Sequence, residues 1–346
     1  MNRSKIEWCD HTWNPITGCR HNCSYCYARA MTVRFAGDVR LNKMAKADYT
    51  LCDAADGGEK IYILDKPMIN ETGKALVYPF DFEPTYHRYR LNMPQKLKMG
   101  NNIFVGAMSD VFGSWIPENI IKEIFDVCLA HPEHNYLFLT KNSKGYITRS
   151  IPKGHNNMFY GMSITREAEI IERINGLPAF GKKFVSIEPL LEDINLQKYE
   201  QYIKCLDWII IGAETGIQKQ KIVPQLEWIK KIIAVADSYE IPVFMKDSLI
   251  DIVGENNMRR EYPNELTKKK VSEKLEKRWF DSCCKCKSYL KKNEMITLLA
   301  RSKRHGRPKQ FGFMCKECFE KFCKKLELDI PQLDGIMITF EDNQNE

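Results

Sequence analysis

Three cysteines occur at C-x₃-C-x₂-C spacing in the stretch Gly18-Cys19-Arg20-His21-Asn22-Cys23-Ser24-Tyr25-Cys26-Tyr27. This spacing lets one short loop turn Cys19, Cys23 and Cys26 toward a single inorganic centre. A structural zinc site has four protein ligands, whereas a cuboidal iron–sulfur cluster held by three cysteines keeps one iron open to another ligand. Three ligands therefore favour a centre at which chemistry takes place.

The cysteine spacing, with Tyr25 directly before the third cysteine, resembles the signature of the radical S-adenosylmethionine (SAM) superfamily. The resemblance implies that the three cysteines hold a 4Fe-4S cluster whose open iron binds the methionine moiety of SAM. It also implies that one electron from the cluster cleaves SAM to a 5′-deoxyadenosyl radical, and that the backbone of Tyr25 contacts the adenine. The residues alone leave one alternative, a zinc knuckle completed by His11 or His21.

Length and composition predict a globular protein with one large domain and a small appendix. The chain has 346 residues and an apolar content of 44%, which is ordinary for a protein with a sizeable core. It contains no apolar run of 18 residues and no apolar segment of the signal-peptide kind near its N-terminus. Thirteen cysteines, an odd number, favour metal ligation over a disulfide framework. We therefore expect a soluble, cytoplasmic protein that does not associate with membranes.

The positive charge is concentrated in the C-terminal part. Residues 251–325 contain 21 Lys and Arg against 10 Asp and Glu, so the rest of the chain, which is +7 in total, carries −4. A basic module beside a slightly acidic body indicates a polyanionic partner, most often nucleic acid. The alternative is a solvated lysine-rich face.

Short apolar runs alternate with helical patterns from residue 75 onward. Continuous apolar runs are typical of strands that are buried on both faces of a parallel sheet. The predicted strands are 75–78, 103–106, 136–139, 158–161, 184–187, 208–211 and 241–244, with a further segment near 6–16. Residues 117–130 and 225–237 carry apolar side chains at helical spacing, and 61–64 predicts a small hairpin. The pattern predicts an α/β fold, a TIM-like (β/α) barrel that is partial or complete.

Polar or ionisable residues end six of the predicted strands. Right-handed crossovers place the C-terminal ends of parallel strands on one face, which is where barrels of this kind carry their function. A single serine there is often only the N-cap of the next helix; this alternative holds for Ser163 but does not explain the lysines and glutamates. The residues are Asp110, Lys141, Ser163, Glu188, Glu214 and Lys246.

Longer phrases carry a closer resemblance, over about residues 5–248, to an uncharacterised radical SAM family first catalogued in bacteriophage genomes. That family is similar to spore photoproduct lyase, which repairs a thymine dimer in DNA. The phrases are Trp13-Asn14-Pro15-Ile16-Thr17-Gly18-Cys19, Ala107-Met108-Ser109-Asp110-Val111-Phe112, Leu139-Thr140-Lys141, Val185-Ser186-Ile187-Glu188-Pro189-Leu190-Leu191 and Ile210-Ile211-Gly212-Ala213-Glu214-Thr215-Gly216.

This resemblance implies roles for the strand-end residues. Lys141 and Ser163 would bind SAM, with Lys141 facing the methionine carboxylate, and Ser109 or Asp110 would lie near the ribose. The catalytic residues left for the substrate are Glu188, Glu214 and Lys246.

The lyase uses a cysteine as a hydrogen-atom donor, and no cysteine of this chain corresponds to it securely. Cys9 and Cys52 are candidates on chemistry alone. Cys128 and Cys205 are expected in the core, because free cysteine is often buried as a small hydrophobe.

The C-terminal region predicts a separate small domain. We expect a barrel over residues 1–250 with an irregular insertion near 45–74, a charged linker or covering segment over 251–280, and a domain over 281–346. Two C-x₂-C pairs predict a zinc ribbon, with an auxiliary iron–sulfur cluster as the alternative; the four ligands are Cys283, Cys286, Cys315 and Cys318.

A basic finger lies between these two pairs of cysteines. It is suited to contact with phosphates, and its alternative is a solvated loop. Its predicted nucleic-acid-binding residues are Arg301, Lys303, Arg304, Arg307 and Lys309.

Together these patterns predict a radical SAM enzyme that modifies or repairs a nucleobase in DNA or RNA. It would use a 4Fe-4S cluster, SAM and zinc, and a one-electron donor such as a flavodoxin or ferredoxin. One alternative is a non-catalytic nucleic-acid-binding protein with two structural metal sites. The other is a radical SAM enzyme that acts on a peptide or small metabolite.

Overall fold

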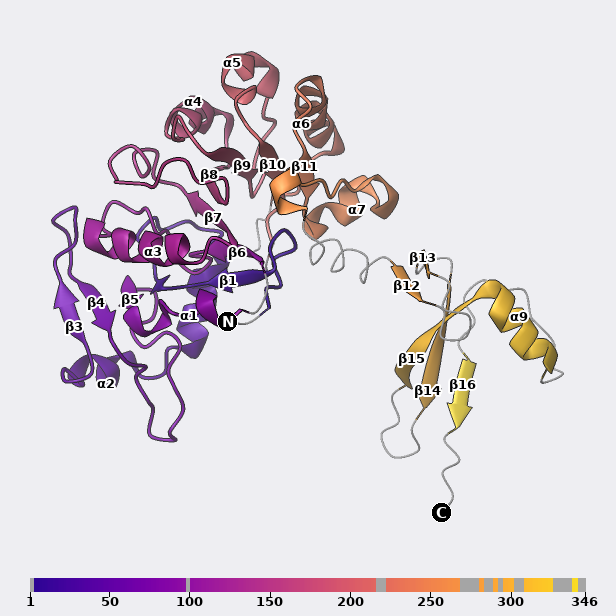
Figure 1. Cartoon of the computed structure of the whole chain (residues 1–346), viewed down its shortest axis with the longest axis horizontal. Helices are drawn as coiled ribbons and strands as arrows, with labels where there is room; N and C mark the ends of the chain where they lie inside the picture. The colour runs from indigo at the N-terminus through magenta and orange to yellow at the C-terminus, as the bar shows by residue number, and fades with distance from the viewer. Residues whose placement is uncertain are drawn as a thin grey trace. The chain divides into compact units, whose positions relative to one another are not determined.

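The computed structural model describes residues 3–97, 100–215 and 222–267, together with 280–282, 289–291, 295–301, 308–325 and 338–341. The chain divides into two compact units, Met1–Lys268 and Lys269–Glu346 (Figure 1). Within the described residues, no helix has the length and apolar character needed to cross a membrane.

The first unit is organised around an open sheet in which seven strands are all parallel (Figure 1). The strand order is β1 (His11–Trp13), β6 (Asn102–Val105), β7 (Asn135–Thr140), β8 (Met158–Ile164), β9 (Lys182–Ile187), β10 (Trp208–Ile211) and β11 (Val243–Met245). Strands β1 and β11 form the two edges of this sheet and do not pair with each other. The α/β prediction is confirmed, and of its two forms the structure has the partial barrel.

Both faces of the sheet are buried, as the continuous apolar runs predict. Every residue of β6, β8 and β10 is buried. One face packs against the helices, and the other carries an aromatic cluster around Trp8. The Trp8 ring lies 4.7 Å from that of Phe104 and 6.1 Å from that of Trp208, measured between ring centroids.

Helices follow the strands and cover the outer face of the sheet (Figure 1). They are α3 (Glu118–Ala130), α4 (Ile170–Asn175), α5 (Glu200–Ile203), α6 (Leu226–Ser238) and α7 (Ile250–Val253). In α3, five apolar residues at helical spacing are all buried: Ile120, Ile121, Ile124, Phe125 and Cys128. The helices predicted over 117–130 and 225–237 are confirmed to within one residue at each end.

Residues 251–267 close the N-terminal end of the partial barrel. The side-chain amides of Asn102 and Asn135, which begin β6 and β7, donate to the carbonyl oxygens of Leu266 and Glu265 at 2.9 and 2.8 Å. The ring of Tyr262 packs on the aromatic cluster, 5.5 Å from that of Trp208. This end of the sheet is therefore covered, and the C-terminal ends of the strands are left for a site.

A second sheet is formed by four short strands that precede β6 in the chain. Its order is β2 (Ile16–Thr17), β5 (Thr85–His87), β4 (Ile61–Leu64) and β3 (Thr50–Cys52). Strands β3 and β4 are antiparallel, which confirms the predicted hairpin. The helices α1 (Tyr27–Phe35) and α2 (Val39–Met44) lie between β2 and β3 in the chain.

The strand predicted over residues 75–78 is wrong. That run contains no strand, and its one backbone bridge joins Ala75 to Ile69. Val77 is exposed, and Pro79 directly after the run cannot donate to a sheet ladder. The edge of the parallel sheet next to β6 is occupied instead by β1, from the segment near residues 6–16.

The second unit contains a short antiparallel pair, β12 (Phe280–Ser282) and β13 (Tyr289–Lys291), and a three-stranded sheet. In that sheet β14 (Met295–Arg301) pairs with β15 (Pro308–Cys315) and β16 (Ile338–Glu341), and helix α9 (Lys316–Lys325) follows β15.

The zinc ribbon stays a prediction. Cys283 and Cys286 lie outside the described residues, whereas Cys315 ends β15 and Cys318 lies in α9. Of the basic finger, Arg301 ends β14 and Lys309 lies in β15, and the other predicted residues, Lys303, Arg304 and Arg307, lie outside the described residues.

Candidate active site

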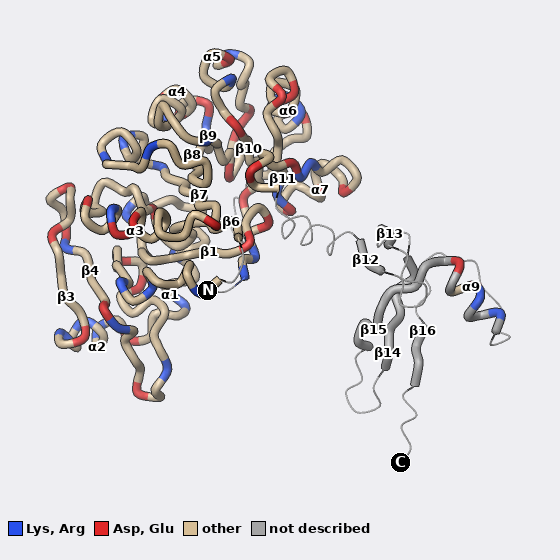
Figure 2. The backbone as a smooth tube through the Cα atoms, viewed as in Figure 1, with Lys and Arg blue, Asp and Glu red and all other residues tan. Residues whose placement is uncertain are grey.

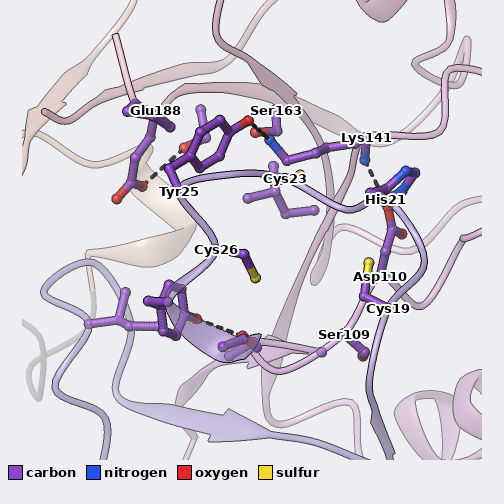
Figure 3. Close-up of a pocket in the computed structure, with 18 of the residues that line it drawn as sticks. Cys19, His21, Cys23, Tyr25, Cys26, Ser109, Asp110, Lys141, Ser163 and Glu188 are labelled. Atoms are coloured by element: carbon purple, nitrogen blue, oxygen red, sulfur yellow. Dashed lines mark hydrogen bonds and ion pairs between the residues drawn. The ribbon is translucent and has the colours of Figure 1, made fainter. Parts of the chain in front are cut away.

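A pocket of about 1090 Å³, counted with its open mouth, lies at the C-terminal ends of the parallel strands. The structure brings together here the three cysteines and every strand-end residue that the sequence predicts for the barrel (Figure 3). These residues are Cys19, Cys23, Tyr25, Cys26, Ser109, Asp110, Lys141, Ser163, Glu188, Glu214 and Lys246.

The cysteine loop leads from β2 into α1 and is held from two sides. The backbone N–H of Gly18 donates to the carbonyl of Met108 at 2.9 Å, and that of Cys19 donates to the carbonyl of Phe82 at 3.1 Å. Gly18 has φ +83°, and a Cβ on it would lie 2.3 Å from the carbonyl oxygen of Glu83. Only glycine fits here, because the backbone is left-handed and another backbone approaches closely.

Replacing Gly18 by alanine is expected to lower the free energy of unfolding by roughly 3 kcal/mol, because left-handed strain and overpacking add. Urea denaturation followed by circular dichroism measures this. The matched control is Gly57→Ala, since Gly57 has φ +74° with no atom within 4 Å of its Cβ position. Equal losses in the two variants would contradict the role given to close backbone approach.

The three cysteines have the donor chemistry of a soft metal centre, and Figure 3 shows their side chains around one hollow. Burial, with the charge of Asp110 nearby, raises the pKa of the Cys19 thiol to about 12. Cys19 is therefore a thiol at neutral pH until a metal displaces its proton. Across the described ranges, no three His, Cys, Asp or Glu side chains are close enough to hold a metal ion as they stand.

His21, between the first two cysteines, is tied to Asp110 with 2.7 Å between Nε2 and Oδ2. The buried Asp110 carboxylate also accepts from the hydroxyl of Thr140 at 2.8 Å, and from the backbone N–H groups of Lys141 and Phe112 at 2.9 and 3.0 Å. Burial alone would raise the pKa of Asp110, but the hydrogen bonds and the charge of His21 outweigh it, so the pKa is lowered. One carboxylate thus joins the cysteine loop to the ends of β6 and β7.

Sequence reasoning treated His21 only as a zinc ligand and missed this role. No local pattern reveals it, because His21 and Asp110 are 89 residues apart in the chain. His11, the other histidine considered, lies in β1 and is not among the residues that line the pocket.

Lys141 follows β7 and reaches the cysteine loop. Its Nζ donates to the hydroxyl of Tyr25 at 2.6 Å and lies 4.7 Å from the centre of the Tyr25 ring (Figure 3). An ammonium group carries three N–H donors, so this contact orients the lysine without using all of its donors. The arrangement places a cation inside the pocket, next to the cysteines.

Lys246 and Glu188 form an ion pair at the other side of the pocket, where they follow β11 and β9. Burial alone would lower the pKa of Lys246, but the carboxylates of Glu188 and Glu7 outweigh it, so the pKa is raised. Glu214, which follows β10, is also buried, and it accepts from the backbone N–H of Ile222 at 3.4 Å. Among the described residues that line this half, two are glutamates and one is a lysine.

The two serines that were predicted to bind SAM, Ser109 and Ser163, line the pocket and are nearly buried. Ser163 lies within β8, and the N-cap of the helical turn that follows is Arg166. The N-cap alternative for Ser163 is therefore wrong. The hydroxyl of Ser109 has no hydrogen-bond partner among the described residues.

The remaining cysteines considered from the sequence are not among the residues that line the pocket. Cys9 is buried, and its thiol donates to the hydroxyl of Ser4 at 3.2 Å. Cys52 ends β3, at the edge of the second sheet. Cys128 is buried in α3 as expected, but the core prediction for Cys205 is wrong, because Cys205 is exposed just after α5.

The fold and the site define a class: a parallel partial barrel with a cysteine-lined pocket at the C-terminal ends of its strands. The chain belongs to the family described as "Protein of unknown function (DUF5131)", whose model matches residues 3–284. A comparison with curated proteins finds no match.

Solved structures similar to the chain include several forms of spore photoproduct lyase. A cysteine-to-serine mutant is 11% identical with a TM-score of 0.35, over 94% of this chain and 74% of that one. A mutant with bound AdoMet and dinucleoside spore photoproduct is 10% identical with a TM-score of 0.34, over 94% and 73%. The lyase complexed with dinucleoside spore photoproduct is 10% identical with a TM-score of 0.32, over the same shares.

Proposed function

We propose that the chain is a radical SAM enzyme in which Cys19, Cys23 and Cys26 hold a 4Fe-4S cluster. The observation that carries this proposal is that a three-cysteine loop and Lys141 line one pocket at the open end of a parallel partial barrel. Soft thiolates suit an iron–sulfur centre, and three of them leave one iron for a further ligand.

The two histidines considered as a fourth zinc ligand differ in position. The Nε2 of His21 is committed to Asp110, and His11 lies outside the pocket lining. A zinc knuckle needs a fourth ligand from the protein. His11 is not presented for that purpose, and His21 has only its Nδ1 left for a metal, so the metal content measured in the test below decides between the two centres.

When bound, the cluster and SAM supply a 5′-deoxyadenosyl radical that abstracts a hydrogen atom from the substrate. Lys141 holds the methionine carboxylate of SAM with the N–H donors that Tyr25 does not use. Asp110 fixes both the cysteine loop, through His21, and the backbone of Lys141 itself. We assign Ser109 and Ser163 to the remaining polar atoms of SAM, because both hydroxyls line the same pocket.

We propose that the substrate group lies against Glu188, Glu214 and Lys246. Because Lys246 is already paired with Glu188, this half of the pocket suits an uncharged group that both donates and accepts hydrogen bonds, rather than a phosphate. A nucleobase has this chemistry, and Trp8 and Phe104 supply an aromatic wall to the same pocket.

We propose a base in DNA or RNA as the substrate. We assign the backbone phosphates of that nucleic acid to the basic finger between the C-terminal cysteine pairs. In this proposal Cys283, Cys286, Cys315 and Cys318 bind zinc, which would supply much of the folding energy of so short a region.

The test is anaerobic reconstitution with iron and sulfide, followed by reduction with dithionite in the presence of SAM and an assay for 5′-deoxyadenosine. Wild type is expected to load iron and form the product, and Cys23→Ala is expected to fall to background in both. Cys205→Ala is the matched control, because Cys205 is exposed and outside the pocket. If zinc fills the first site and no product forms, the non-catalytic binding protein takes the place of this proposal.

A further inference from the structure

The two helices that follow the cysteine loop expose an unusual number of large apolar side chains. They hold six of the fourteen exposed large hydrophobic residues found among the described residues: Tyr27, Met31, Val33, Phe35, Leu41 and Met44. Met44 is 74% exposed and Val33 is 63% exposed. Concentrated exposed apolar surface on a protein marks an interaction site.

Helix α2 is held against the segment that follows α1. The side-chain amide of Asn42 in α2 donates to the carbonyl of Ala36, just after α1, at 3.1 Å, and to the carbonyl of Pro79 at 2.8 Å. Helix α2 has no buried residue of its own, so it adds surface to the unit without adding to its core. We call the exposed residues of α1 and α2 the α1–α2 face.

The α1–α2 face is also positively charged. Residues 27–46 contain five basic residues and one acidic residue, and Figure 2 shows lysine and arginine along both helices. The single acid, Asp38, uses its carboxylate to cap α2 through the backbone N–H groups of Arg40 and Leu41. This charge stands out because the chain outside residues 251–325 is negative overall.

The composition of the face indicates a protein partner. Aromatic residues, methionine and arginine are enriched in protein–protein interfaces, and the face combines Phe35, Met31 and Met44 with Arg34 and Arg40. Proteins contact nucleic acid mostly through polar and basic side chains that bind phosphates. Exposed apolar residues do not make such contacts. The partner that complements this face is an acidic protein.

The face lies next to the cysteines and borders the barrel mouth: Tyr27 lines the pocket at the strand ends, and the other exposed apolar residues of the face do not. Helix α1 begins at Tyr27, directly after Cys26. A second pocket, of about 920 Å³ counted with its open mouth, is lined by Cys19, by the basic residues Arg20 and Arg29, and by the acidic residues Asp56, Glu59, Asp81 and Glu83. Cys19 thus borders two pockets, one at the strand ends and one beside α1. A partner on the α1–α2 face would approach the cysteines without entering the pocket assigned to SAM and substrate.

We propose that the α1–α2 face is the docking surface of an acidic one-electron carrier protein that reduces the centre at Cys19, Cys23 and Cys26. This inference rests on the proposed function, whose chemistry requires one electron. The reduced carrier loses one electron and the centre gains it, and no proton or covalent bond is transferred. Complexes between redox proteins are small and electrostatically steered, which agrees with a basic face built from two short helices.

The test variant is Arg34→Glu/Arg40→Glu, and the matched control is Lys122→Glu/Lys230→Glu on α3 and α6, where the two lysines are 72% and 58% exposed. The probes are reduced flavodoxin and reduced plant-type ferredoxin, with dithionite as the small-molecule reductant. Circular dichroism confirms that each variant is folded. Binding of each carrier to the protein before reconstitution is measured by calorimetry, so one readout does not depend on activity.

We expect the variant to bind at least one of these carriers roughly tenfold more weakly than wild type, with a similar loss of carrier-driven 5′-deoxyadenosine, because like charges now face each other. Its dithionite-driven rate should match that of wild type, and the control should match wild type in every assay. Phe35→Ser should weaken the same binding without a change of charge.

Two results would overturn the docking surface: carrier binding equal in the variant and the control, or loss of oligonucleotide binding in the variant while carrier binding is kept. Absence of product with dithionite in wild type would instead count against the proposed function. The binding measurements distinguish the two failures, since they require neither the cluster nor SAM.

Discussion

Lys141→Ala is expected to weaken the binding of SAM about 10- to 100-fold, because a charge-assisted hydrogen bond to a carboxylate contributes about 1.5–3 kcal/mol. Lys246→Met is expected to leave SAM affinity unchanged, since Lys246 is paired with Glu188 on the other side of the pocket. The dissociation constant is measured by calorimetry on reconstituted protein without reductant, so no turnover occurs.

The two lysines are each other's control. Both follow a strand of the same sheet and line the same pocket, and they differ in their partners, the hydroxyl of Tyr25 for Lys141 and the carboxylate of Glu188 for Lys246. Equal losses of SAM affinity in the two variants would contradict the division of the pocket into a cofactor half and a substrate half. A selective loss in Lys246→Met would reverse the assignment.

Asp110→Ala is expected to lower the free energy of unfolding at pH 7 by about 3–4 kcal/mol, because it leaves His21 and several buried donors without their acceptor. The pKa of Asp110 is lower in the folded chain than in the unfolded one. A lowered carboxyl pKa stabilises the fold at pH values above the unfolded pKa of about 3.9, and this stabilisation is lost as the pH falls through the folded pKa.

The difference between wild type and Asp110→Ala should therefore be constant from pH 7 to pH 5 and should shrink below about pH 4. Urea unfolding at a series of pH values measures this difference in the free energy of unfolding. The variant Asp110→Asn separates the effect of charge from that of shape, since the amide keeps the size of the side chain. A difference that persisted undiminished at pH 3 would show that the ionised form of Asp110 is not what stabilises the loop.

The parallel strands and their polar ends were predictable because each depends on a short local pattern. The run at 208–211 is apolar throughout and lies in β10, and the ionisable residue that follows it, Glu214, lines the pocket. The spacing of Cys19, Cys23 and Cys26 likewise needs no tertiary information. For these features, sequence order alone determines which side chains meet at the sheet edge.

Other features depend on contacts between distant segments, which one sequence does not display. The run at 75–78 has the composition of a strand but leaves Val77 exposed, while the three residues of β1 take the edge position. The contact between His21 and Asp110 joins two loops that no local pattern relates. Cys205 is as apolar as Cys128, yet the position of α5 leaves it exposed.

Residues 251–267 pack against the N-terminal ends of the strands and belong to the first unit. A fragment ending at residue 250 would lack Tyr262 and the carbonyl groups that satisfy Asn102 and Asn135. It would present aromatic rings and unpaired amides to water at the N-terminal ends of the strands. The first unit therefore extends to about residue 267, and Arg259 and Arg260 lie in a covering segment, one of the two forms predicted for residues 251–280.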